Sequence, residues 1–178
     1  WKPRAIKVKE LSDNIFNYIE GLKTELKKDS KLQPDGKFNE DDLEAATRLF
    51  VTDDKNKGKG EELYAKMEQY KKDLGSIDKS IAGMVNSLPI DLSIPTLQNK
   101  DNQDIVDKMA TPQLKWSYIY FHMTPTIAGL ALLSKFQNDI RNSEAQLIEN
   151  CYSLITTTKV PITDFGVIAG ANATLVRS

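Results

Sequence analysis

Residues 61–88 read EELYAKMEQYKKDLGSIDKSIAGMVNSL, which is the most regular hydrophobic pattern in the chain. Its apolar side chains recur at alternating steps of four and three residues: Leu63, Met67, Tyr70, Leu74, Ile77, Ile81, Met84 and Leu88. This heptad repeat predicts one apolar stripe along a continuous helix of about 42 Å, ended by Pro89. Gly75 and Gly83 lower the intrinsic helix propensity, so packing must hold the helix. The stripe fits a bundle core and, alternatively, a homo-oligomeric coiled coil.

Two further long helices are predicted on either side of this stretch. The first runs from about Pro3 to Asp29, where apolar residues recur at steps of three or four and the turn at 33–36 follows. The second runs to about Ile155 from Thr124 and Pro125, which are expected as its N-cap and its first helical residue. Three long stripes predict an all-α fold, an elongated up-down helical bundle.

Shorter elements fill the connections. We predict a short helix at 41–50 with Asn39 as its N-cap, and another at 101–110 after an extended stretch rich in proline. The aromatic stretch 113–121 fits either a turn of helix or an extended strap. After Thr156 the pattern changes to short β-strands, so we divide the chain into a helical domain at 1–156 and a linker with first strands of a β-rich domain at 157–178.

Composition excludes several classes of protein. The 178 residues carry 24 Lys and Arg against 25 Asp and Glu, a net charge of −1, whereas a nucleic-acid binder should be basic. One Cys and one His cannot build a disulfide framework or a zinc site of the common kinds, and no cofactor is expected. The longest apolar run, 127–133, is too short to cross a bilayer. Since the chain starts at Trp1, we expect a fragment or a processed product, which leaves open a membrane anchor or a targeting signal upstream.

Few residues are candidates for chemistry. His122 has no second His or Cys with which to share a metal, and Cys151 lies on an apolar stripe, so both are expected to be structural, with an intersubunit disulfide as the alternative for Cys151. The loop at 53–58 fails the calcium-loop pattern because lysines occupy two ligand positions. Arg141 and Glu144 lie three apart on a helix and can pair. We therefore predict no catalytic site, no metal site and no enzymatic activity.

The sequence resembles the periplasmic region of the GldM/PorM family in two blocks. The first is AIKVKELSD at 5–13, followed by YIEGLK at 18–23. The second is Trp116, then FHMTP at 121–125 and LLSKFQNDIRNSEA at 132–145. The residues of this chain that match the family signature, or pack around it, are Trp116, Phe121, Met123, Pro125, Leu133, Phe136, Asn138, Asp139, Arg141, Asn142 and Glu144.

The resemblance implies a component of the type IX secretion and gliding machinery of Bacteroidetes. Such proteins are anchored in the inner membrane by one upstream transmembrane helix, which pairs with a GldL/PorL-type partner in a proton-motive-force-driven motor. Their periplasmic part is a dimeric shaft that reaches GldK/PorK-type and GldN/PorN-type ring proteins. This chain would be the first, helical domain of that shaft. A ligand-sensing or signal-sensing bundle is the alternative, which a polar cavity near Asn138 and Arg141 would favour.

Overall fold

The structure is a computed structural model that describes residues 2–53 and 57–156. Its described residues form helices and no strand beyond an isolated bridge between Leu32 and Phe38, so the all-α prediction is confirmed. The β-like stretch predicted for 157–178 lies outside the described residues. The helices are α1 (Lys2–Asp29), α2 (Leu43–Phe50), α3 (Lys59–Ile77), α4 (Lys79–Met84), the 3-10 turn η1 (Val85–Ser87), α5 (Lys100–Asp107), α6 (Pro112–Phe121) and α7 (Thr126–Thr156).

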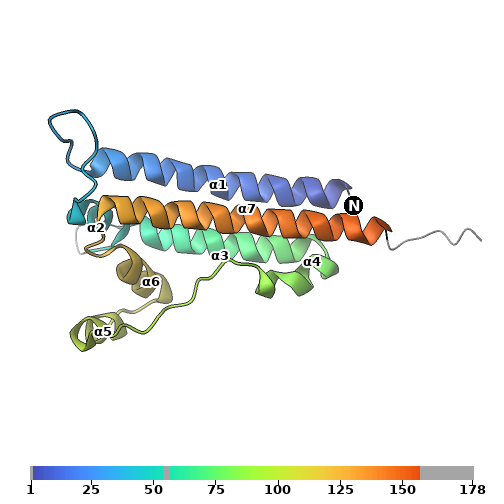
Figure 1. Ribbon diagram of the computed structural model, residues 1–178. Helices are drawn as coiled ribbons and strands as arrows, with labels where there is room; N and C mark the ends of the chain where they lie inside the picture. The colour runs from blue at the N-terminus through green and yellow to red at the C-terminus, as the bar shows by residue number, and fades with distance from the viewer. Residues whose placement is uncertain (1, 54–56, 157–178) are drawn as a thin grey trace, which may run out of the picture.

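Three long helices, α1, α3 and α7, lie side by side and give the molecule its length (Figure 1). The short helices α2 and α6 pack where α7 begins, and α4 lies at the opposite end, near the start of α1 and the end of α7. The apolar stripe predicted for 3–29 is the buried face of α1. Burial of these stripes against one another drives the assembly, because each helix alone would expose its apolar face.

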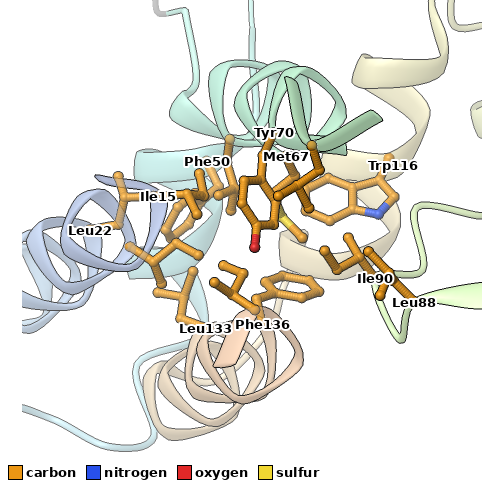
Figure 2. Close-up of a cluster of buried hydrophobic side chains, with 14 of the residues drawn as sticks. Ile15, Leu22, Phe50, Met67, Tyr70, Leu88, Ile90, Trp116, Leu133 and Phe136 are labelled. Atoms are coloured by element: carbon orange, nitrogen blue, oxygen red, sulfur yellow. The ribbon is translucent and has the colours of Figure 1, made fainter. Parts of the chain in front are cut away.

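The core lies between the three long helices, and its fourth side is closed by α6 and the segment after η1 (Figure 2). Ile15 and Leu22 enter it from α1, Met67 and Tyr70 from α3, and Leu133 and Phe136 from α7. Trp116, Leu88 and Ile90 face them from the remaining side. The heptad stripe predicts either a bundle core or a homo-oligomeric coiled coil. These contacts show that its residues lie in the core of this chain.

The prediction of one continuous helix over 61–88 is wrong. α3 ends at Ile77, and Asp78 adopts an extended conformation with φ −164° and ψ 154° before α4 begins. The side chain of Asp78 accepts a hydrogen bond from the backbone N–H of Ser80 at 2.9 Å and so caps the new helix. The heptad pattern cannot reveal this break, because the apolar spacing continues across it without interruption.

Two predicted N-caps are also wrong. The cap of α2 is Asp42 and not Asn39, because the carboxylate of Asp42 accepts from the N–H groups of Glu44 and Ala45. Thr124 does not cap α7, since its hydroxyl donates to the carbonyl oxygen of Tyr120 at 3.0 Å, and Pro125 is not the first helical residue, since α7 begins at Thr126. The aromatic stretch at 113–121 is helical, and Thr111 caps it.

Candidate functional site

Polar side chains link α1 to α7 at the junction between the two helices. Arg141 of α7 donates from Nη1 to Oδ1 of Asp13 on α1 at 2.7 Å and to Oε2 of Glu144 at 2.6 Å. Its guanidinium also lies 4.3 Å from the ring centre of Phe16. The predicted pairing of Arg141 with Glu144 is confirmed, and Asp13 is a partner that the sequence analysis did not identify. Lys9 and Arg141 together hold the pKa of Asp13 below its ordinary value.

One turn earlier on α7, the buried side chain of Gln137 makes a second link to α1. Its Nε2 donates to Oε2 of Glu20 at 2.9 Å and to the backbone carbonyl of Phe16 at 3.2 Å. Its Oε1 accepts from Nζ of Lys23 at 3.1 Å. The amide hydrogen bond lowers the pKa of Glu20. Because a buried amide must satisfy both its donor and its acceptor, Gln137 fixes the register of α7 against α1.

An aromatic cluster fills the core beside this junction. Trp116 is fully buried and lies 5.5 Å, between ring centres, from Phe136 of α7 and from Tyr64 of α3. Phe121 lies 5.9 Å from Trp116 and stacks on Phe50 of α2 at 4.0 Å. Aromatic contacts in this range add to the gain from burial. The cluster therefore ties four helices together.

Asp42 connects three segments at the end of the bundle where α7 begins. Besides capping α2, its carboxylate accepts from the N–H of Lys31 at 3.2 Å and pairs with Arg48. Its backbone carbonyl accepts from the N–H of Thr126 at 3.1 Å, in the first turn of α7. Burial alone would raise the pKa of Asp42, but the N–H donors and Arg48 outweigh burial and lower it. An aspartate directly before an apolar helix is the sequence signal that could have identified this residue as the cap.

The family described as the GldM N-terminal domain matches residues 1–153. The chain belongs to this family. Membership makes it a component of type IX secretion and gliding motility. Among curated proteins, none matches the chain.

The signature residues of this GldM N-terminal domain fall into two groups. Trp116, Phe121, Leu133 and Phe136 are buried together in the aromatic core. Arg141 and Glu144 form the junction with α1, whereas Asp139 pairs with Lys135 at 2.7 Å on α7 itself. The remaining signature residues are wholly or partly exposed: Met123, Pro125, Asn138 and Asn142. Met123 has a φ of 51°, in the left-handed region, at the turn between α6 and α7.

The polar cavity that would favour sensing is not found at Asn138 and Arg141. The structure leaves Asn138 exposed, and Nη1 of Arg141 is engaged by Asp13 and Glu144. Asn138 is not among the residues that line the open groove beside Arg141, which are Glu144, Ala145, Ile148, Glu149 and Tyr152. The sensing alternative thus gains no support from this part of the domain.

The remaining candidates from the sequence are His122, Cys151 and the loop at 53–58. His122 stacks on Tyr118 at 4.2 Å between ring centres, and burial lowers its pKa. Cys151 is buried with a free thiol. The loop at 53–58 falls partly outside the described residues, and no group of three metal-ligating side chains occurs within the described part. The helices described here include none that is both long enough and apolar enough to cross a membrane.

Proposed function

We propose that this GldM N-terminal domain is a non-enzymatic coupling element of a periplasmic shaft in a proton-motive-force-driven motor. Its task is to transmit force between the inner-membrane side of the machine and the parts farther out. Membership in the family indicates which machine the domain belongs to. The hydrogen bonds of Arg141 and Gln137 across the junction between α1 and α7, called the seam below, support the mechanical role. A close-packed interior resists deformation, so a long domain of this kind is suited to carry load.

The seam is the main support for the proposal, because its hydrogen bonds restrain sliding of α1 along α7. The links at Asp13–Arg141 and Glu20–Gln137 are made by residues nearly two turns apart on α1 and one turn apart on α7. A shift of one residue, about 1.5 Å along the axis, would strain or break these bonds together. Leaving the buried amide of Gln137 unpaired would add a penalty of about 1–3 kcal/mol.

The location and partners belong to the same proposal. The domain lies in the periplasm, attached to the inner membrane by an upstream transmembrane helix that pairs with a GldL/PorL-type protein. The full-length protein is a homodimer, and its distal domains reach GldK/PorK-type and GldN/PorN-type ring proteins. A photo-crosslinking residue at Lys72, which is exposed, tests these contacts in the full-length protein. Capture of a second copy or of a ring component is the expected outcome.

The mechanical role is tested by loosening the seam in the full-length protein in its native cells. Gln137→Ala combined with Arg141→Ala removes both links, whereas Asn138→Ala combined with Asn142→Ala changes exposed residues of the same helix and serves as the control. We expect cargo secretion and gliding speed to fall in the first variant, at unchanged protein abundance, and to stay normal in the second. Normal secretion and gliding by a seam variant whose isolated domain melts at a lower temperature would contradict the proposal.

A further inference from the structure

The sequence pattern of segment 59–88 predicts one continuous helix, but the structure of this segment is broken. Its heptad spacing continues from Leu74 and Ile77 to Ile81 and Met84 without a skip, as in one uninterrupted helix. In the structure, however, α4 turns back at the end of α3 (Figure 1). A Cβ atom placed on Gly75 would lie 3.7 Å from Cγ2 of Val85. Ten residues of straight helix would separate these positions by about 15 Å, so the segment is folded back on itself.

Asp78 supplies the local interactions that favour this break. Its carboxylate accepts from the N–H of Ser80 at 2.9 Å and from the hydroxyl of Ser80 at 2.7 Å. The same carboxylate pairs with Nη2 of Arg4, in the first turn of α1, at 2.8 Å. Neither of its neighbours, Ile77 and Lys79, is a proline or a glycine that would end a helix by itself. The break therefore depends on one strong N-capping residue.

Burial stabilises the folded-back form once the break is made. Ile81 is fully buried, and Leu88 and Ile90 are nearly so. Nζ of Lys71 on α3 donates to the carbonyl oxygen of Ile90 at 3.2 Å. A straight helix would give up these contacts and gain the intrahelical hydrogen bonds missing across Asp78. It would extend α3 by eleven residues, about 16 Å, past the end of the bundle where α1 starts.

We propose that Asp78 is a conformational latch: its side chain holds residues 59–88 folded back as α3 and α4, and loss of this cap lets the segment form one continuous helix. In the continuous form, Ile81, Met84 and Leu88 become an uncovered apolar stripe at the end of the molecule. Through Arg4, the latch also connects the start of α1 to the position of α4. This device is independent of the coupling role proposed above.

The latch is tested by a distance measurement in the isolated chain. Spin labels at Ala65→Cys and Asn86→Cys, both exposed positions, in a Cys151→Ala background report the two forms by pulsed electron paramagnetic resonance. A continuous helix separates the two Cα atoms by about 32 Å, and the folded-back form holds them much closer. Asp78→Ala removes the cap and the ion pair with Arg4. Asp78→Asn loses the charge but keeps an oxygen that can cap, and serves as the matched control.

We expect a single short distance for the wild-type residue and for Asp78→Asn, and a narrow second peak at about 32 Å for Asp78→Ala. Helical content measured by circular dichroism should rise in Asp78→Ala alone. An unchanged short distance in Asp78→Ala would overturn the proposal. So would a broad distribution with falling helicity, since that indicates local unfolding, or an equal long peak in Asp78→Asn, since that would exclude the cap as the cause.

Discussion

Trp116 is the residue on which the aromatic core depends most. It is fully buried among side chains from α3, α6 and α7, yet its indole Nε1 has no hydrogen-bond partner. Trp116 therefore stabilises the fold through the shape and the buried apolar area of its ring, whereas its unpaired indole N–H lowers the stability. A ring of similar shape without that N–H would keep most of the packing.

Trp116→Ala should lower the free energy of unfolding by about 3–5 kcal/mol, because it removes a buried ring and leaves a cavity. Trp116→Phe, the control, should cost clearly less, since it keeps an aromatic ring and removes the unpaired N–H. Urea unfolding followed by circular dichroism measures both. Equal midpoints for Trp116→Ala and the wild-type residue would show that the ring does not support the core.

Asp42 is a second residue with effects beyond its own helix. Asp42→Ala should lower the free energy of unfolding by about 1–3 kcal/mol, because three backbone N–H groups, of which that of Ala45 is buried, lose their acceptor. Asp42→Asn keeps an acceptor oxygen and should lose less. Urea titrations of the three proteins compare them, and an Asp42→Asn loss as large as that of Asp42→Ala would assign the effect to charge instead of capping.

At the scale of elements, the approach of α3 to α2 and α6 depends on a missing side chain. A Cβ on Gly60, in the first turn of α3, would lie 2.6 Å from the carbonyl oxygen of Phe50 and 2.1 Å from Oγ of Ser117. Those two atoms are themselves joined by a hydrogen bond of 2.6 Å. Since backbone cannot yield as a flexible side chain can, only glycine permits this contact.

Gly60→Ala should therefore destabilise the domain by about 1–3 kcal/mol, through overpacking at this contact. Gly21→Ala is the matched control, because Gly21 lies within α1 and a Cβ there would meet nothing within 4 Å. It should stabilise the protein by about 0.5–1 kcal/mol through helix propensity. Thermal melts of the two variants should shift in opposite directions, and a stabilising Gly60→Ala would disprove the close contact.

For the whole molecule, the carboxylates with lowered pKa values determine the response to acid. Asp13, Glu20, Asp42, Asp78 and Asp91 all have pKa values below their ordinary ones in the folded state. As the pH falls, the unfolded chain binds protons before the folded domain does, so the stability from these groups is present above the unfolded pKa and is lost below it.

The free energy of unfolding should fall steeply once the pH drops below about 4. Burial lowers the pKa of His122, so a smaller loss should already occur as the pH falls through about 6.5. Urea unfolding at pH 7, 5, 4 and 3 measures the profile. In a His122→Asn variant the small decrease in the free energy of unfolding near pH 6.5 should disappear, and the large decrease below about pH 4 should remain. A constant midpoint between pH 5 and pH 3 would show that these carboxylates contribute nothing.

The amino-acid sequence by itself determined the all-α class, the position of the long helix at 3–29, the pairing of Arg141 with Glu144 and the family. These features rest on local periodicity, on i to i+3 spacing or on the signature itself, which need no knowledge of distant contacts. The sequence does not decide between a helix and an extended strap at α6, because its aromatic residues form no stripe that separates the two.

Only the tertiary structure decided the break at Asp78 and the partners of Gln137. Asp78 is as compatible with a solvated helix position as with a cap, and only its contacts with Ser80 and Arg4 in the folded chain show it as the cap. Gln137 lies 117 residues from Glu20 along the chain, so no local pattern can pair them. Contacts between distant segments depend on how stripes pack, and packing is a property of the assembled fold.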